Sequence, residues 1–408
     1  MEQWFLRLPP RVRTLLLIAL PLIVTAIAFY PSLSNGWTTW DDNIYVTDNP
    51  VVTSISPENL RIITTRALDG SYIPLTLFSY MVDYHIAGYD PAMYHRTNLL
   101  FHLLNVALFF VFVHRLSGST VAAVVASILF GIHPMRVESV AWISGRKDVL
   151  SMAFFLGACI HYLRWIDQKP GRPLFWTFVF FIASLFSKPI GITFPLLLIL
   201  FDAYRGRKLS VVLLTEKIPF AVVAGVFAVI AYLGQISVHA LRPGTRLFDN
   251  AVISLHGIAF YIEKLFLPFR LSNLYVTPEP LTWDFYAMAM MTVAGFVLLW
   301  KYRENRTLIF GAMFFVIALL PVLQLVRFSK MFAADRFTYI AYCGLFFGAG
   351  IIAEGWWNNG NKRRLLVILS IITIALGTVT WERCGVWKDS QTLWQDMLSK
   401  YPDPVGPR

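Results

Sequence analysis

The chain has 408 residues, of which 57% are hydrophobic and only 14% are charged, and its mean hydropathy is +0.59. This composition excludes an ordinary soluble domain and indicates an integral membrane protein. The net charge of +11 does not indicate a nucleic-acid partner, because the basic residues stand in short clusters between apolar runs. Cys159, Cys343 and Cys384 are too scattered for a disulfide framework or a zinc site.

Apolar runs of about 20 residues, the length that a helix needs to cross a bilayer, recur along the chain. They predict an all-α polytopic membrane protein with about eleven transmembrane helices, near residues 14–30, 97–113, 119–133, 149–166, 174–187, 190–204, 218–234, 284–300, 307–325, 337–354 and 365–381. The first run resembles a signal peptide but has no small-residue cleavage site after it, so we expect a retained anchor.

Basic clusters between the runs set the predicted orientation. They are Arg164, Lys169 and Arg172; Arg205, Arg207, Lys208 and Lys217; Lys301, Arg303 and Arg306; and Lys362, Arg363 and Arg364. All fall on the cytoplasmic side, with the N-terminus, if segment 251–270 is a re-entrant or interfacial helix. If that segment crosses, there are twelve spans. The expected location is the cytoplasmic (inner) membrane, with the loops that lack basic clusters and the C-terminus outside.

The first external loop, 31–96, carries two adjacent carboxylates, Asp41 and Asp42, in the stretch WDDNIYVTDNP. A helix is expected at 57–66, where serine and proline stand at its start, followed by an aromatic stretch that lies on the surface. An Asp-Asp-Asn triplet often does no more than form a turn. Neighbouring side chains in an extended loop point to opposite faces, so the two aspartates are not expected to reach the same atom.

A second external loop reads HPMRVESVAWISGRKD. If it is helical, Glu138, Trp142 and Arg146 lie on one face, and this combination would suit a phosphosugar. Glu138 and Arg146 would be about 12 Å apart along the axis, so each needs another partner. The alternative is that Glu138 pairs with Arg136 and Trp142 anchors the chain at the membrane surface.

Lys188 and Arg336 stand at predicted outer ends of apolar runs. Cations there would stabilise a phosphate, although basic residues also extend from span ends to reach water. Asp335 is expected to hold Arg336 in place. His133, next to Pro134, is typical of a helix end, and no second histidine stands at metal-ligand spacing. We therefore predict no required metal, although paired carboxylates could bind a divalent ion.

Five stretches, in this order, resemble those of bacterial relatives of the transmembrane and tetratricopeptide-repeat (TMTC-like) O-mannosyltransferases: WDDNIYVTDNP, SYIPLTLFSYMVDYHIAGYDPAMYHRTNLLFHLLN, HPMRVESVAWISGRKDVLS, SKPIGITFPLLLILFD and AADRFTYIAYCGL. That family is similar in plan to the GT-C glycosyltransferases, multispanning enzymes that take a sugar from a polyprenyl-phosphate carrier. The resemblance implies a GT-C-like domain over residues 1–381 and a lipid-linked sugar as donor. Mannose and a Ser/Thr acceptor in exported protein are suggested, and a lipid or glycan acceptor stays open.

The resemblance also gives roles to the candidate residues. An inverting transfer needs a carboxylate that takes a proton from the acceptor hydroxyl. We predict Asp41 as this base, with Asp42 supporting it through acceptor contact or loop anchoring, and Glu138 at acceptor or sugar hydroxyls. The donor phosphate is assigned to Arg146, Lys147, Lys188 and Arg336, and further substrate contacts to Trp142, His133 and Tyr72.

The tail, residues 382–408, resembles the helix that opens a tetratricopeptide repeat. A single repeat of about 34 residues cannot bury a core alone. The chain is truncated before its repeats, or the repeats lie on another chain as a partner, or the protein works without them. The alternative is an amphipathic surface helix anchored by Trp387 and Trp394.

A different class of function is a polyprenyl-linked glycan transporter or flippase, or a catalytically silent assembly scaffold. Against transport, the two halves of the sequence show no matching helices broken by glycine or proline, and no charge stands near the middle of a predicted span. The charged residues instead gather at one predicted membrane face, as a surface reaction site requires. We therefore favour a transferase.

Overall fold

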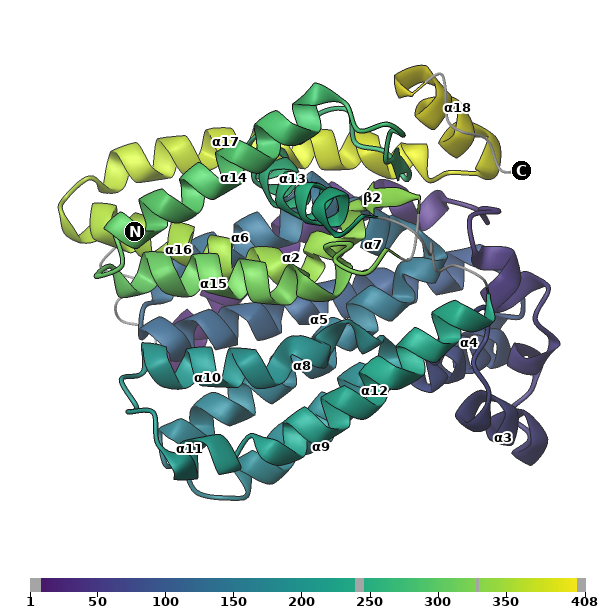
Figure 1. The fold of residues 1–408 in the computed structure, drawn as a ribbon, viewed down its shortest axis with the longest axis horizontal. Coiled ribbons are helices and arrows are strands. Elements are labelled where there is room, and N and C mark those ends of the chain that lie inside the picture. The colour runs from purple at the N-terminus through teal and green to yellow at the C-terminus, as the bar shows by residue number, and fades with distance from the viewer. Residues whose placement is uncertain (1–8, 239–245, 328–329, 402–408) are drawn as a thin grey trace.

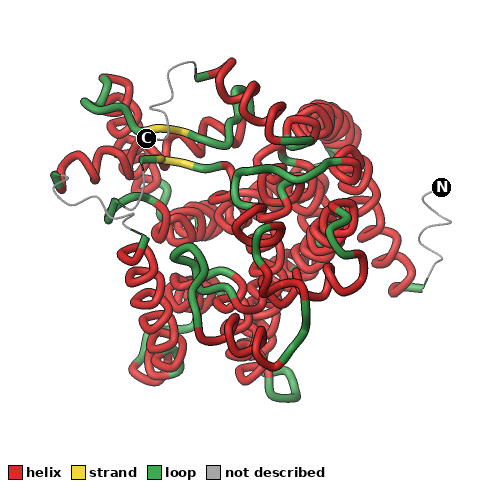
Figure 2. Tube along the Cα trace, turned by 90° about the vertical axis from the view of Figure 1, so that its right-hand side faces the viewer, coloured by secondary structure: helices red, strands yellow, loops and turns green. Residues whose placement is uncertain are grey.

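The computed structural model describes residues 9–238, 246–327 and 330–401, which fold into an elongated helical bundle (Figure 1). The helices are α2 (Pro10–Phe29), α3 (Pro57–Thr65), α4 (Pro74–Ala87), α5 (Pro91–Ser117), α6 (Thr120–Ile132), α7 (Val137–Ala141), α8 (Arg146–Ile166), α9 (Pro173–Ser187), α10 (Phe194–Tyr204), α11 (Val211–Thr215), α12 (Ile218–Ser237), α13 (Leu247–Phe266), α14 (Trp283–Lys301), α15 (Arg306–Leu319), α16 (Thr338–Asn358), α17 (Lys362–Val386) and α18 (Ser390–Lys400). Strands β1 (Tyr275–Val276) and β2 (Met331–Ala333) pair antiparallel (Figure 2).

Each apolar run predicted to span is a helix in the structure. Among the described residues, seven helices are long and apolar enough to cross a membrane, or eight if the bent pair formed by α6 and the segment Pro134–Ala141 is one span. Shorter apolar helices cover Pro173–Ser187, Pro189–Tyr204 and Arg306–Val322. The all-α polytopic class is confirmed, whereas the count of eleven spans is not.

Local sequence explains several helix boundaries. Ser56 accepts a hydrogen bond from the backbone N–H of Asn59 and Pro57 follows it, so α3 begins where the sequence predicts. Ser119 caps α6 in the same way. Gly118, whose φ of 75° is costly for other residues, ends α5. The surface helix expected at 57–66 is confirmed.

The loops gather at two opposite ends of the bundle (Figure 1). Helices α3, α4 and α18 lie at one end, whereas α11 and the turn between α16 and α17 lie at the other. At this second end Arg205 donates to the backbone oxygen of Arg115 at 2.6 Å and pairs with Asp167 at 3.7 Å. Basic turns that are distant in sequence therefore meet, as the charge pattern predicts. Which end faces the cytoplasm stays a prediction.

Helix α13 occupies the segment expected to be re-entrant or interfacial. In Figure 1 it is strongly foreshortened, whereas α12 and α17 lie across the view. Its C-terminal end is held at the bend after α6, where His133 Nε2 is 3.0 Å from the backbone oxygen of Leu265. Within the described residues it is not among the helices apolar enough to cross a membrane. This orientation fits the expectation for residues 251–270.

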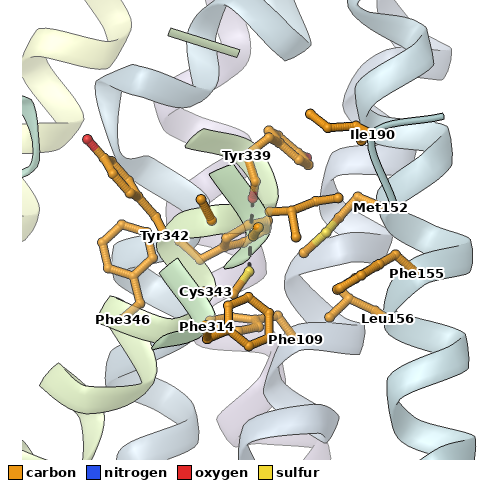
Figure 3. Packing of buried hydrophobic residues seen from close by; sticks show 14 of the residues in the cluster. Phe109, Met152, Phe155, Leu156, Ile190, Phe314, Tyr339, Tyr342, Cys343 and Phe346 are labelled. Atoms are coloured by element: carbon orange, nitrogen blue, oxygen red, sulfur yellow. Dashed lines mark hydrogen bonds between the residues drawn. The ribbon is translucent and has the colours of Figure 1, made fainter. Parts of the chain in front are cut away.

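The core beneath the loop end is rich in aromatic rings (Figure 3). Tyr339 and Cys343 of α16 lie beside Phe109 of α5 and Phe155 of α8, all of them buried. The three cysteines are free and buried, so they form no disulfide. In a membrane, such interlocking rings supply the van der Waals contact that holds helices together without a hydrophobic driving force. The core thus gives the loops a rigid base.

The first loop packs against the ends of α9 and α12. Thr76 Oγ1 donates to the backbone oxygen of Ser187 at 2.9 Å. The turn at Gly70 lies directly against Gly234 of α12, where an added Cβ would come within 2.2 Å of the Gly70 oxygen. No side chain fits between these backbones. Glycine at 234 therefore sets how closely the loop approaches the bundle.

Gly234→Ala should push the Gly70 turn away and lower the free energy of unfolding by roughly 1–3 kcal/mol, as overpacking does. The measurement is unfolding of the purified protein in detergent. Gly225→Ala is the matched control, since it lies on the same helix with nothing within 4 Å of its Cβ. The control should be neutral or stabilising by up to about 1 kcal/mol. Equal effects of the two substitutions would contradict this packing.

Candidate functional site

Asp42 is buried and joins two loops. Its Oδ2 accepts hydrogen bonds from the backbone N–H and the hydroxyl of Thr38, at 3.0 and 2.9 Å. Its Oδ1 accepts from the backbone N–H and the hydroxyl of Ser144, at 2.9 and 2.6 Å. Burial raises the pKa of Asp42, and these four hydrogen bonds oppose that rise. Of the two supporting roles predicted for Asp42, the geometry fits loop anchoring.

Asp41 projects the other way and stays accessible. Its side chain is 27% exposed, and its Oδ2 lies 3.3 Å from Nζ of Lys147. The two carboxylates therefore have different surroundings, as predicted, but the expected extended loop is not found: Asp42 has helical φ and ψ angles of −62° and −31°, and the N–H of Tyr45 donates to the backbone oxygen of Asp41. Both carboxylate oxygens of Asp42 accept structural hydrogen bonds, whereas the carboxylate of Asp41 is partly exposed and a ligand can reach it.

Lys147 is held between Asp41 and two aromatic rings. Its Nζ lies 4.6 Å from the centre of the Tyr45 ring and 5.0 Å from that of Trp142. A cation over aromatic faces loses less on desolvation than one in an aliphatic pocket. Its side chain is 12% exposed, so the ammonium can still meet an incoming anion.

Lys188 forms a second ion pair, with Asp148. Nζ lies 2.5 Å from Oδ1 of Asp148, and the lysine side chain is 14% exposed. The pKa of Lys188 lies below its ordinary value, chiefly because of burial and also because of the positive charges of Lys147 and Arg336, while Asp148 opposes the shift. These cations from α8, the α9–α10 connection and the turn just before α16 therefore lie close together.

Arg336 is the third cation, beside Lys147 and Lys188, and is held by Glu138. We refer to these three residues as the cation group. The backbone N–H of Arg336 donates to Oε2 of Glu138 at 2.8 Å, and its guanidinium pairs with Oε1. The guanidinium also lies 5.5 Å from the ring centre of Trp142. Glu138 is almost fully buried, whereas the Arg336 side chain is 14% exposed. Glu138 therefore positions Arg336, and the predicted contact with sugar or acceptor hydroxyls receives no support from this geometry.

The structure shows neither the alternative pairing of Glu138 with Arg136 nor the expected pairing of Asp335 with Arg336. Arg136 does not pair with Glu138, because its Nη2 donates to the backbone oxygen and the hydroxyl of Thr338 at 3.0 Å each. Asp335 does not hold Arg336, since its Oδ1 accepts from the hydroxyl of Tyr275 at 2.8 Å. The actual partners of these residues are distant in sequence.

The predicted helical stripe is also wrong. Helix α7 ends at Ala141, Trp142 is extended with φ −89° and ψ 128°, and α8 begins at Arg146. The break is fixed by Gly145, where a Cβ would lie 2.8 Å from the backbone oxygen of Glu138. Only glycine allows the turn to fold back so closely. The break sends neighbouring side chains of this segment in different directions.

Arg146 consequently points into the protein interior. It is fully buried, with Nη2 2.6 Å from Oδ2 of Asp83 and 3.0 Å from the backbone oxygen of Tyr94. It also donates to Ser79 and Asn98. This network ties α4 and α5 to the start of α8, so its predicted phosphate contact is corrected to a structural one.

The remaining predicted substrate residues have structural contacts. Trp142 is 1% exposed and stacks on Trp387 with ring centres 5.7 Å apart, so it is not a surface anchor. His133 is buried, accepts from the backbone N–H of Met135 at 3.3 Å and acts as a helix-end residue. The Tyr72 hydroxyl donates to the backbone oxygen of Thr64 at 2.7 Å, and burial raises its pKa. The described contacts of His133 and Tyr72 lie outside the cation group.

Asp148 is the site residue that the sequence analysis missed. Besides its ion pair with Lys188, its Oδ2 is buried with no hydrogen-bond partner among the described residues. The sequence does carry a signal for Asp148: it is a carboxylate at the start of an apolar helix, directly after Lys147. A charge buried there is costly, so it indicates a functional or paired position. In the described part of the chain, no three His, Cys, Asp or Glu residues are grouped as metal ligands. The absence of a metal requirement stays a prediction.

We refer to Asp41, Lys147, Asp148, Lys188 and Arg336 as the cation–carboxylate cluster. It lies at the end of the bundle that carries the first loop, and each cation has one carboxylate neighbour. Desolvated cations of this kind stabilise phosphate oxygens strongly. Asp41 is the carboxylate of the cluster that stays accessible, next to the position where such an anion would be held.

Comparison with known proteins confirms the resemblance drawn from the five stretches. No protein-family model matches the chain. It is 23% identical to human protein O-mannosyl-transferase TMTC3 over 381 residues, covering 80% of this chain and 40% of that protein. It is 24% identical over 408 residues to protein O-mannosyl-transferase F38B6.6 of Caenorhabditis elegans, covering 93% and 58%. The chain thus spans 40% and 58% of the length of these two curated relatives.

One solved structure to which the chain shows similarity is ArnT from Cupriavidus metallidurans, whose crystal structure contains undecaprenyl phosphate. The TM-score is 0.45 at 14% sequence identity, and the match covers 89% of this chain and 64% of that chain.

The two aspartates should differ sharply in stability tests. Asp42→Asn should lower the free energy of unfolding by at least about 2 kcal/mol, because several buried donors lose a charged acceptor. Asp41→Asn, at a partly exposed position, should change it by no more than about 0.5 kcal/mol. Thermal or chemical unfolding of both variants in detergent is the measurement. A greater loss in Asp41→Asn would contradict the assignment of Asp42 as the anchor.

Proposed function

We propose that this chain is a membrane glycosyltransferase that moves a sugar from a polyprenyl-phosphate carrier to an acceptor hydroxyl with inversion. The observation that carries the proposal is the accessible carboxylate of Asp41, 3.3 Å from Lys147 and beside the other cations of the cation–carboxylate cluster. This places a base and an anion site next to each other. The names of the relatives favour mannose as the sugar and a protein Ser/Thr hydroxyl as the acceptor.

The cations suit the leaving group. When the bond from the anomeric carbon to the phosphate oxygen breaks, its electron pair stays with the polyprenyl phosphate, which gains negative charge. Lys147, Lys188 and Arg336 are preorganised to stabilise that charge, because each is held in place by a carboxylate. They need not reorganise as the charge develops.

Asp41 would supply the base. As the acceptor oxygen attacks the anomeric carbon from the side opposite the phosphate, Asp41 takes the hydroxyl proton, the new carbon–oxygen bond forms and the configuration inverts. Lys147 keeps the Asp41 carboxylate oriented before the attack. On this account the site faces the outside of a bacterial inner membrane, and the N-terminus faces the cytoplasm.

The transfer test uses a panel of polyprenyl-phosphate sugars with host membrane extract as acceptor. Wild-type protein should transfer label, and Asp41→Asn should lose roughly 10²–10⁴-fold in kcat, the usual contribution of a general base, while donor binding persists. Asp48→Asn, an exposed position in the same loop, is the matched control and should stay active. If the wild type binds donor lipid but transfers nothing, the proposal fails. Movement of sugar between leaflets without acceptor would then favour a transporter.

The lowered pKa of Lys188 predicts that donor binding weakens at alkaline pH. As pH rises toward that pKa, Lys188 loses its proton before an ordinary lysine does, so the phosphate is held less well and KM for the donor rises. Lys188→Arg should move this weakening to higher pH, because arginine stays protonated. Lys169→Arg, at an exposed position in the turn between α8 and α9, should leave the profile unchanged. An identical alkaline limb in Lys188→Arg would contradict the role of Lys188.

A further inference from the structure

The tail folds back onto the first loop. Asn35 Nδ2 donates to the backbone oxygen of Cys384 at 3.0 Å, and the N–H of Gly36 donates to that of Lys388 at 2.8 Å. Helix α17 continues to Val386, so the domain boundary predicted at residue 381 falls inside it. The end of α17 is therefore joined to the segment that leads into Asp41.

A further hydrogen bond reaches closer to the base. The backbone N–H of Thr39 donates to Oγ of Ser390, the first residue of α18, at 2.9 Å. The next residue, Trp40, packs edge-on against Trp394 of α18 with ring centres 5.4 Å apart. Both residues immediately before Asp41 thus rest on α18.

Trp387 is linked to the cations Lys147 and Arg336 through Trp142. It is fully buried and its ring stacks on that of Trp142. Trp142 in turn lies under Lys147 and Arg336, at 5.0 and 5.5 Å. Trp387 therefore fixes the aromatic surface on which two of the phosphate-binding cations rest, without being placed to touch a donor itself.

The tail is itself held firmly. Asp396 pairs with Arg383 of α17 and with Lys400, at 2.6 Å each. Lys400 also donates to the backbone oxygen of Leu271 at 2.9 Å. Leu393 and Met397 of α18 are buried. These contacts fix α18 against the rest of the protein. Because Trp387 is fully buried, the alternative that it anchors a surface helix does not hold for this residue.

We propose that residues 384–400 are a working part of the transfer site, with Ser390 and Trp387 as positioning residues. Ser390 holds the segment that presents Asp41, and Trp387 holds Trp142 beneath Lys147 and Arg336. A displacement of about 1 Å in a reacting group can cost on the order of 10²-fold in rate. The catalytic part of this inference rests on the proposed function, whereas the mechanical link between tail and loop does not.

The mechanical link is tested by hydrogen exchange of the segment 36–46 in purified full-length protein. Ser390→Ala removes the acceptor for the Thr39 N–H and should speed exchange there. Ser399→Ala is the matched control on the same helix. Within the described residues its hydroxyl donates to the backbone oxygen of Asp396, so the substitution should leave the segment unchanged. Unchanged exchange in Ser390→Ala would overturn the link, whether or not the protein transfers sugar.

The catalytic role is tested by kinetics. Trp387→Leu should lower kcat by about 10- to 100-fold with a smaller change in KM for a polyprenyl-phosphate sugar, and Trp387→Phe should restore most of kcat because it keeps a ring to stack. The control is Trp381→Leu. Trp381 lies earlier on α17, is exposed and stacks on Tyr30, so this variant should behave as wild type. Equal loss in Trp387→Leu and Trp381→Leu, or no rescue by phenylalanine, would overturn the positioning role.

Discussion

The site depends first on one buried carboxylate. Asp42 accepts hydrogen bonds from Thr38 and from Ser144, which lies 102 residues further along the chain than Asp42. In a low-dielectric interior such charge-assisted bonds are strong, and leaving them unmade is costly. With Asp42 fixed inward at the start of a short helical segment, Asp41 lies beside Lys147 and stays partly exposed. The position of the proposed base is therefore a consequence of the anchoring of its neighbour.

Burial also separates the other charged residues into structural ion pairs and partly exposed cations. Arg146 and Asp83 are buried and hold helices together, and removing one partner of such a pair leaves an uncompensated charge that costs several kcal/mol. In the cation–carboxylate cluster the cations keep 12–14% of their side-chain surface. A protein dominated by apolar residues keeps these partly open charges at one end of its bundle, where an anion can reach them. The proposed donor phosphate would bind there.

Much of this arrangement could be predicted from the sequence, because apolar runs and caps are local signals. Every predicted apolar run is a helix, α3 begins behind Ser56, and Asp41 and Asp42 face apart. The break at Trp142 could not be predicted, since it is set by the contact of Gly145 with the backbone of the preceding turn. The partners of Arg146 and Glu138 lie 63 and 198 residues away. Spacing along one segment carries no information about them.

The most direct test of the central claim is a structure of the Asp41→Asn variant with a bound polyprenyl-phosphate sugar. The account predicts that the phosphate lies within hydrogen-bonding distance of Lys188 and Arg336, with the anomeric carbon turned toward residue 41. Donor phosphate bound elsewhere, for example at the basic turn around Arg205 at the opposite end of the bundle, would contradict the assignment of the cation–carboxylate cluster as the transfer site.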